Sequence, residues 1–204
     1  QRVAALDGGA AGLALASGTS ANFYAIINIC QAGDEVVSAR NLYGGTYTMF
    51  NNILPQFGIK VNLVDGTDPK AFDAAITDKT KAVFCETVTN PGLEVSDIKA
   101  IADVAHSHGL PLIVDSTFTT PYLYQPLTDG VDYVVHSTTK YLAGHGDALG
   151  GAVIGGSARM AGVREVLKQV GGCLGPNEAY LTLRGLKTFP LRVRSFRPGD
   201  RFHP

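Results

Sequence analysis

The fold is decided by residues 82–115, which read AVFCETVTNPGLEVSDIKAIADVAHSHGLPLIVD. The stretch begins and ends with short apolar runs, a pattern typical of strands that are buried on both faces. Between these runs, residues 97–108 place apolar side chains at helical spacing, and we predict Ser96 as the N-cap of this helix and Gly109 as its end. A strand, a helix and a second strand in this order predict a parallel sheet covered by helices.

The same alternation extends in both directions along the chain. Residues 20–31 and 70–76 are further predicted helices, and residues 177–194 predict one long helix weakened by Pro190. Residues 195–204 are polar and predict no element. The predicted strands are residues 12–16, 35–39, 60–64, 82–86, 110–115, 132–136 and 151–154. We therefore expect one α/β domain whose sheet is mostly parallel and has helices on both faces.

The composition of the 204 residues is that of an ordinary globular protein, with 45% hydrophobic and 17% charged residues. A formal net charge of −1 argues against nucleic acid or an anionic membrane as the main partner, because neither would meet an excess of positive charge. No apolar run approaches the length that spans a bilayer. Residues 1–6 resemble the middle of a helix and not a signal peptide, so we expect the chain to begin inside a longer protein.

The three cysteines, Cys30, Cys85 and Cys173, are far apart and odd in number. No CxxC pair and no histidine at ligand spacing accompanies them, so we expect neither a disulfide framework nor a metal site. Cys30 and Cys85 lie within apolar runs, where small buried core residues are expected. A reduced, cytoplasmic protein is the prediction.

Polar residues gather where the predicted strands end. In open parallel sheets, ligands bind beyond the carboxyl ends of the strands. The segments at these ends are Ser17-Gly18-Thr19-Ser20, residues 86–90, Asp115-Ser116-Thr117 and His136-Ser137-Thr138-Thr139-Lys140. Together they suit a phosphorylated, cationic heteroaromatic ring that forms an imine.

The first of these segments has features of a phosphate site. Gly18 lets backbone N–H groups approach a phosphate, and the N-terminus of the following helix favours its negative charge. Ser137 and Thr139 could add hydroxyl donors. Many turns between a strand and a helix have the same composition, and such hydroxyls often only form turns or caps.

Two charged residues could meet the ring itself. Asp115 ends a very apolar run, where a carboxylate is costly unless it is paired, and a protonated pyridine nitrogen would be a suitable partner. A cap or a salt bridge at the strand end is the alternative. Lys140 could form the imine if its amine is kept neutral by burial or by cationic neighbours; otherwise it is a solvated surface charge.

The run His136-Ser137-Thr138-Thr139-Lys140-Tyr141-Leu142-Ala143-Gly144-His145-Gly146-Asp147 resembles the lysine signature of the Cys/Met-metabolism pyridoxal-phosphate (PLP) enzymes. That family includes cystathionine γ-synthase, γ-lyases and O-acetylhomoserine sulfhydrylase. The resemblance covers residues 1–194. Four further matches follow the order of the family: Ser17-Gly18-Thr19, Tyr43-Gly44-Gly45-Thr46, Glu86-Thr87 with Asn90-Pro91, and Asp115-Ser116-Thr117-Phe118. An aminotransferase would share the fold but not this lysine pattern.

The resemblance implies three catalytic residues. Lys140 would carry the cofactor pyridoxal 5'-phosphate as an imine and move protons between the substrate carbons. Asp115 would pair with the pyridine nitrogen. Tyr43 would stack on the ring face and assist as an acid–base group.

The resemblance also implies how the cofactor is bound. Gly18, Thr19, Ser137 and Thr139 would hold its phosphate, and Asn90 would reach the ring hydroxyl. The implied fold is the large domain of the fold-type-I PLP-dependent transferases over residues 1–194. An N-terminal arm and a C-terminal small domain would lie outside this chain, and the implied assembly is a homo-oligomer, a dimer of dimers.

The expected reaction is γ-replacement on an activated homoserine ester by a sulfur nucleophile, with a small amino acid as substrate and no metal. A methionine or cystathionine γ-lyase is the first alternative. Gly45 stands where the methionine γ-lyases carry cysteine, whereas residues 157–172 lack an insertion that many sulfhydrylases have. A truncated core that binds PLP without turnover is the second alternative, because Arg184, Arg192 and Arg194 are only stand-ins for the arginine that binds the substrate carboxylate.

Overall fold

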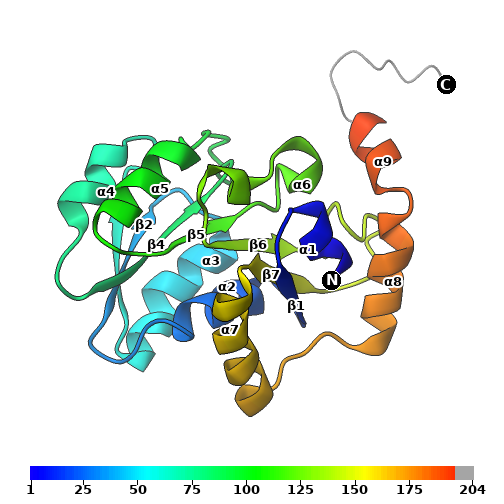
Figure 1. Ribbon diagram of the computed structural model, residues 1–204, viewed down its shortest axis with the longest axis horizontal. Coiled ribbons are helices and arrows are strands. Elements are labelled where there is room, and N and C mark those ends of the chain that lie inside the picture. Colours follow the sequence, from blue (N-terminus) through cyan, green and yellow to red (C-terminus); the bar gives the residue numbers. More distant parts are fainter. Residues whose placement is uncertain (196–204) are drawn as a thin grey trace.

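The computed structural model describes residues 1–195 of the chain. Within this part, seven strands form one sheet in the order β1-β7-β6-β5-β4-β2-β3 (Figure 1). The strands are β1 (Ala11–Leu15), β2 (Glu35–Ala39), β3 (Lys60–Val64), β4 (Thr80–Glu86), β5 (Leu112–Asp115), β6 (Tyr133–Ser137) and β7 (Gly151–Gly155). All seven predicted strands are therefore present, and their ends differ from the prediction by two residues at most.

The sheet is mostly parallel, as predicted. The pairs β2–β3, β2–β4, β4–β5 and β5–β6 run parallel, whereas β7 runs antiparallel to both of its neighbours, β1 and β6. The physical reason is the short connection between β6 and β7. A parallel return needs a crossover, usually a helix, and residues 138–150 form only a turn. As a result, the carboxyl ends of β1 and β6 point to the same edge of the sheet.

Helices cover both faces of the sheet (Figure 1). In that view α4 and α5 lie on one side, and α2 and α7 lie on the other. The α-helices are α1 (Arg2–Leu6), α2 (Gly18–Ile27), α3 (Gly44–Thr48), α4 (Pro69–Ala75), α5 (Ile98–Ser107), α6 (Thr120–Leu123), α7 (Ser157–Val170), α8 (Pro176–Leu186) and α9 (Phe189–Ser195).

Three details of the predicted helices were wrong. The helix predicted over residues 20–31 is α2, which ends at Ile27. Asp97, not Ser96, caps α5, because its side chain accepts a hydrogen bond from the N–H of Ala100. The exit segment is two helices, α8 and α9, and not one. Pro190 lies in the first turn of α9, where its missing N–H breaks no helical hydrogen bond. Ser195 ends α9, and the rest of the predicted irregular tail lies outside the described residues.

The main core lies between the central strands and the helices. Val83, Phe84, Ile113 and Val134 are completely buried, and each large apolar side chain contributes roughly 1.5–3 kcal/mol by leaving water. Cys85 is buried among them, as expected for a core cysteine. A second, small core joins distant parts of the chain, and its buried members are Leu142, Phe189 and Val193.

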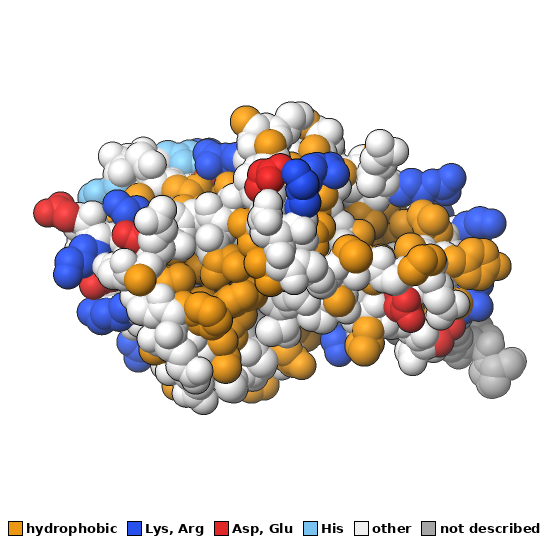
Figure 2. Space-filling model, turned by 90° about the horizontal axis from the view of Figure 1, so that it is seen from below, with side chains coloured by type: hydrophobic (Ala, Val, Ile, Leu, Met, Phe, Trp, Pro, Cys, Tyr) orange, Lys and Arg blue, Asp and Glu red, His pale blue; other side chains and the backbone are white. Residues whose placement is uncertain are grey.

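The surface carries some apolar area. Figure 2 shows hydrophobic side chains over the middle of one face, with charged side chains mainly towards its margin. Within residues 1–195, no helix combines the length and the apolar character that a bilayer crossing requires. The same part of the chain contains no group of three or more His, Cys, Asp or Glu side chains arranged to hold a metal ion.

Candidate active site

A cavity of about 670 Å³ lies at the carboxyl edge of the sheet, within the size range of small-molecule sites. All of the residues predicted to bind the cofactor line it. They are Gly18, Thr19, Tyr43, Asn90, Asp115, Ser137, Thr139 and Lys140. The fold therefore gathers into one cavity side chains that are separated by up to 122 positions in the sequence.

The strand directions explain this convergence. Glu86 and Asp115 end the adjacent parallel strands β4 and β5, and Ser137 ends β6. Gly151 of β7 pairs with both Ser137 of β6 and Leu15 of β1, so the turn that follows β1 reaches the same edge. Side chains at these positions face a common space because parallel strands end together.

One corner of the cavity is formed by the N-terminus of α2. Ser17 is the N-cap and accepts a hydrogen bond from the N–H of Ser20 at 3.0 Å. Gly18 and Thr19 occupy the first turn, where amide groups have no partner within the helix. A Cβ on Gly18 would lie 2.6 Å from the Cβ of Ser137, so only glycine allows the helix to approach this strand end so closely.

The donors in this corner suit a phosphate group. Ser137 lines the cavity, and the α2 N-terminus adds a favourable dipole for an anion. Thr139 also lines the cavity, but its hydroxyl is bonded to the backbone of Gly150, donating to the carbonyl at 3.2 Å and accepting from the N–H at 3.0 Å. In this arrangement Thr139 shapes the turn, and its hydroxyl is already occupied.

The carboxylate of Asp115 is held by two donors. The N–H of Thr117 donates to Oδ1 at 2.9 Å, and Nδ2 of Asn22 donates to Oδ2 at 3.1 Å. Asn22 belongs to α2 and is 2% exposed, and its own Oδ1 is buried without a hydrogen-bond partner in the described residues. The sequence prediction missed Asn22, because its position inside an apolar helix gives no sign that it reaches a strand end 93 positions away.

Glu86 is a second buried carboxyl beside Asp115. It accepts hydrogen bonds from the backbone N–H groups of Tyr43 at 2.8 Å and Asn90 at 3.3 Å. Burial, and after it the nearby charge of Asp115, raises the pKa of Glu86 to about 8, although the two N–H donors act in the opposite direction. One carboxyl group thus fixes the two loops that bring Tyr43 and Asn90 to the cavity.

The ring of Tyr43 lies over the backbone of Gly45. A Cβ at position 45 would lie 2.7 Å from Cε1 of the ring, which is closer than real Cβ contacts. The side chain of Tyr43 is half exposed and lines the cavity. A flat aromatic group on an open wall can cover the face of a planar ligand.

Lys140 lies in the segment between β6 and β7, residues 138–150, here called the lysine turn. The turn is closed by backbone hydrogen bonds from Lys140 to Ser137, from Ala143 to Thr138 and from Gly144 to Lys140. Within residues 1–195, no hydrogen bond or ion pair reaches the ammonium group of Lys140. The side chain is exposed and lines the cavity, so it can reach a ligand there without breaking a contact with the described protein.

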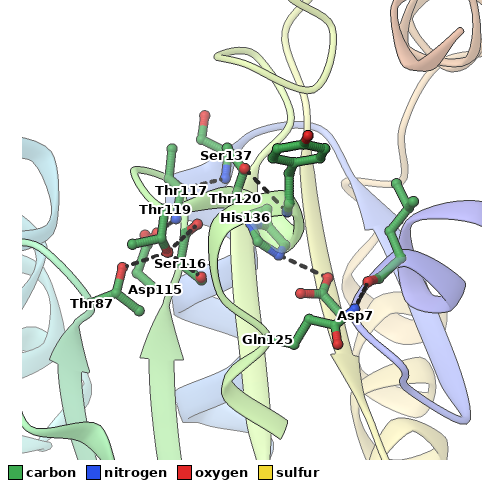
Figure 3. A network of polar contacts seen from close by, with 12 residues as sticks. Asp7, Thr87, Asp115, Ser116, Thr117, Thr119, Thr120, Gln125, His136 and Ser137 are labelled. Carbon is green, nitrogen blue, oxygen red and sulfur yellow. Dashed lines mark hydrogen bonds and ion pairs between the residues drawn. The ribbon is translucent and has the colours of Figure 1, made fainter. Parts of the chain in front are cut away.

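A network of polar contacts includes the cavity-lining residues Asp115, Thr117 and Ser137 (Figure 3). The N–H of Ser137 donates to Oγ1 of Thr117 at 2.8 Å, which ties β6 to the loop that follows Asp115. On the other side of β6, the buried side chains of His136 and Asp7 pair at 2.9 Å. The strand that carries the lysine turn is thus held on both sides.

The three arginines considered for a substrate carboxylate are engaged elsewhere. Arg184 pairs with Asp147, and Arg194 donates to the hydroxyl of Tyr122. Arg192 does line the cavity, but its guanidinium donates to backbone carbonyls and to a threonine hydroxyl. None of the three presents a free guanidinium to the cavity.

The site matches the chemistry of a phosphorylated pyridine ring. The α2 N-terminus can bind a phosphate, and the carboxylate of Asp115 can accept a hydrogen bond from a protonated ring nitrogen. The amine of Lys140, when neutral, can form an imine with a carbonyl carbon. Such a set of donors, acceptor and nucleophile in one cavity is what pyridoxal phosphate requires of a protein. The residues present fit this cofactor.

Comparisons with known proteins agree with this geometry. The family profile described as "Cys/Met metabolism PLP-dependent enzyme" matches residues 1–197. An O-acetyl-L-homoserine sulfhydrylase of Leptospira meyeri is 50% identical over 78% of this chain and 36% of its own length. An L-methionine gamma-lyase of Pseudomonas putida is 43% identical over 94% of this chain and 49% of its own length.

A solved structure has the same fold. The crystal structure described as an O-acetylhomoserine (thiol)-lyase from Campylobacter jejuni, with a pyridoxyl-lysine 5'-monophosphate residue, has a TM-score of 0.92 and 34% identity. The match covers 96% of this chain and 57% of that one. The chain spans about half or less of the length of the curated relatives named above. The fold is that of the fold-type-I PLP enzymes, and the chain belongs to the Cys/Met metabolism family of PLP-dependent enzymes.

Proposed function

We propose that the protein containing this chain catalyses γ-replacement, joining a sulfur nucleophile to the γ-carbon of an activated homoserine ester. The family uses PLP, and its relatives include sulfhydrylases and lyases of sulfur amino acids. The observation that favours replacement over methionine γ-elimination is the glycine at position 45, over whose backbone the Tyr43 ring lies. A cysteine at position 45, as in methionine γ-lyases, would require the ring to lie elsewhere.

When bound, PLP supplies an electron-withdrawing ring that stabilises negative charge at the substrate Cα. In our proposal Lys140 carries the cofactor and then moves protons at Cα and Cβ of the substrate. Asp115, held by Thr117 and Asn22, keeps a proton on the ring nitrogen. Tyr43 covers the ring face and serves as an acid–base group.

The remaining predicted residues orient the cofactor. Gly18, Thr19 and Ser137 hold the phosphate, and Asn90 reaches the ring hydroxyl. Thr139 lies in the same corner and contributes through the backbone of Gly150, to which its hydroxyl is bonded. Fixing a reactive group and its substrate in one geometry removes much of the entropic barrier to reaction.

The whole protein is proposed to be a cytoplasmic homo-oligomer, a dimer of dimers, acting on a small amino acid. Residues 1–194 are proposed to form its PLP-binding large domain. The substrate carboxylate needs a cationic partner, and the three arginines considered above are engaged elsewhere. We therefore propose that the residue that binds the substrate carboxylate comes from outside this chain, and that this chain alone has little activity.

A substrate panel with the full-length protein tests the reaction. O-acetyl-L-homoserine with sulfide should give homocysteine and acetate, and replacing sulfide by cysteine should show whether cystathionine is made instead. Methionine and cystathionine without added thiol should release little 2-oxobutanoate. Rapid 2-oxobutanoate release from methionine, without homocysteine formation from the ester, would establish the γ-lyase alternative, which the 43% identity to a methionine γ-lyase keeps open.

A further inference from the structure

Arg192 of α9 donates hydrogen bonds to the protein from all three of its guanidinium nitrogens, through four of its five N–H groups. Nη1 donates to the carbonyl of Tyr141 at 2.7 Å, and Nη2 donates to the carbonyl of Leu142 at 3.3 Å. Nη2 also donates to the carbonyl of Gly185 at 2.9 Å, and Nε donates to Oγ1 of Thr188 at 3.2 Å. A guanidinium has five N–H groups in a fixed plane, so these contacts set its orientation.

Two glycines make room for this arrangement. Gly144 has a φ of +73°, and a Cβ on it would overlap the guanidinium of Arg192. Gly185 lies against the lysine turn, and a Cβ on it would overlap the carbonyl oxygen of Ala143. The pair of helices α8 and α9 therefore approaches the backbone of the lysine turn directly.

The lysine turn needs the donors that Arg192 supplies. Its own backbone hydrogen bonds use the carbonyls of Ser137, Thr138 and Lys140. The next two carbonyls, of Tyr141 and Leu142, accept from Arg192. Leu142 is 2% exposed, and a buried carbonyl without a donor is costly.

The environment of Arg192 is consistent with a structural contact. Burial lowers the pKa of Arg192 from its ordinary value, so the guanidinium is partly removed from water. Its helix is anchored beside the turn by the small core of Leu142, Phe189 and Val193. A guanidinium that served a substrate carboxylate would instead present a pair of free N–H groups.

We infer that Arg192 is a positioning residue for Lys140, which holds the two carbonyls that follow Lys140 and so fixes where its amine lies in the cavity. This inference rests on the proposed function only in that Lys140 carries the cofactor. The same residue was considered above as a ligand for the substrate carboxylate, and the two roles predict different results.

The test compares Arg192→Met, Arg192→Lys and, as a matched control, Arg184→Met in the full-length protein. Arg184 lies on the neighbouring helix α8 and contacts the same turn through a solvent-exposed ion pair with the Asp147 side chain, not through the backbone carbonyls that follow Lys140, so its loss should change each quantity by about twofold at most. The first readout is the rate at which added PLP becomes fixed to Lys140 by borohydride, followed by peptide mapping. Steady-state kinetics supply kcat and KM for the amino-acid substrate.

Arg192→Met should slow the fixing of PLP to Lys140 and lower kcat, each by roughly ten- to a hundredfold, because small misplacements of a reactive group have effects of this size. KM should change little, and Arg192→Lys should recover part of both losses. A large rise in KM with unchanged kcat and unchanged labelling of Lys140 would overturn the inference in favour of carboxylate binding.

Hydrogen–deuterium exchange separates this inference from the proposed function. In PLP-free protein, Arg192→Met should speed exchange over residues 138–150, and unchanged exchange there would refute the inference. If wild-type protein is labelled at another lysine, the proposed function fails, whereas the exchange experiment still reports on the contact. Should Arg192→Met fail to fold, Thr188→Val removes the hydroxyl that holds Nε of Arg192 and should give the same pattern at smaller size.

Discussion

Two walls of the cavity are held in place by different means. The strand-end wall consists of Glu86 and Asp115, which end β4 and β5 within a continuous parallel ladder. The second wall, the lysine turn, belongs to no strand and contains Gly144, Gly146 and Gly150. The first wall is rigid because its backbone belongs to the sheet, and the second is rigid only through contacts with other elements.

The two walls also differ in which of their groups accept hydrogen bonds and in where the donors come from. On the strand-end wall, carboxylates accept backbone N–H groups of loops, from Tyr43, Asn90 and Thr117. On the lysine turn, backbone carbonyls accept from the side chain of Arg192. Lys140, the proposed cofactor lysine, thus lies in a turn held by a residue from a distant helix, whereas the backbone of Asp115 is fixed by its own strand and its carboxylate is then oriented by Thr117 and Asn22.

The largest effect is expected for Lys140→Ala. This variant removes the amine to which we propose that the cofactor is attached, so turnover and the attachment of PLP should both be lost. The side chain is exposed and no hydrogen bond or ion pair reaches it from residues 1–195, so the free energy of unfolding should change by no more than about 0.5 kcal/mol. Borohydride reduction and peptide mapping of wild type check the assignment, and a pyridoxyl group on Lys79, Lys81 or Lys168 would contradict it.

The next largest effect is expected for Asp115→Asn on the strand-end wall. The amide cannot hold a ring proton, so PLP should stay bound while kcat falls by roughly 10²–10³-fold, the size seen when one preorganised electrostatic group is removed. Asp115→Glu should be milder if the longer side chain fits between Asn22 and Thr117. Turnover near the wild-type level in Asp115→Asn would rule out this role.

The two walls also differ in how much of them the sequence predicts. The strand ends were predicted to the residue at Glu86 and Asp115, because an apolar run followed by a polar residue is a local pattern. The partners of Asp115 and of the lysine turn were not, since Asn22 and Arg192 lie 93 and about 50 positions away. No hydrophobic periodicity along the chain indicates such contacts, because they form only when the fold places distant segments side by side.

The errors in the helices have a related cause. Ser96 and Asp97 are both good N-cap residues, and only the backbone geometry selects Asp97. Pro190 was treated as a weakness within one helix, whereas the chain turns at residues 187 and 188 and places Pro190 in the next first turn. This turn between α8 and α9 allows Arg192 to reach the lysine turn. The helix break and the Arg192 contact, neither of which was predicted, therefore have the same cause.

The strand-end wall should also make stability depend on pH, through Glu86. Its pKa is raised from 4.5 to about 8, first by burial and then by Asp115, so the folded chain binds this proton more tightly than the unfolded chain. The resulting stability is complete below pH 4.5 and is lost as the pH rises through about 8. Glu86→Gln cannot ionise and should remove this dependence.

Thermal melts of PLP-free wild type and Glu86→Gln across that pH range test this expectation. The melting temperature of the variant relative to wild type should rise as the pH increases. A difference that stays constant with pH would show that the pKa of Glu86 is the same in the folded and the unfolded chain. Arg184→Met, which leaves both carboxyls in place, is the control and should follow wild type at every pH.

The smallest effect is expected for Gly45→Ala, at the open side of the cavity between the two walls. The added methyl group would lie 2.7 Å from Cε1 of Tyr43, so the ring must turn away from its present position. The ring is half exposed and can move at little cost, so stability should change by no more than about 0.5 kcal/mol. Because the ring is proposed to cover the cofactor, kcat/KM for the ester substrate should fall about two- to tenfold, with cofactor binding weakened in parallel.

Gly44→Ala is a matched control, because a Cβ there meets no atom within 4 Å. Equal kinetics for the two variants would mean that the position of the Tyr43 ring does not matter to the reaction. Gly45→Cys extends the test: if it raises 2-oxobutanoate release from methionine while ester replacement falls, position 45 helps to choose between the two reactions.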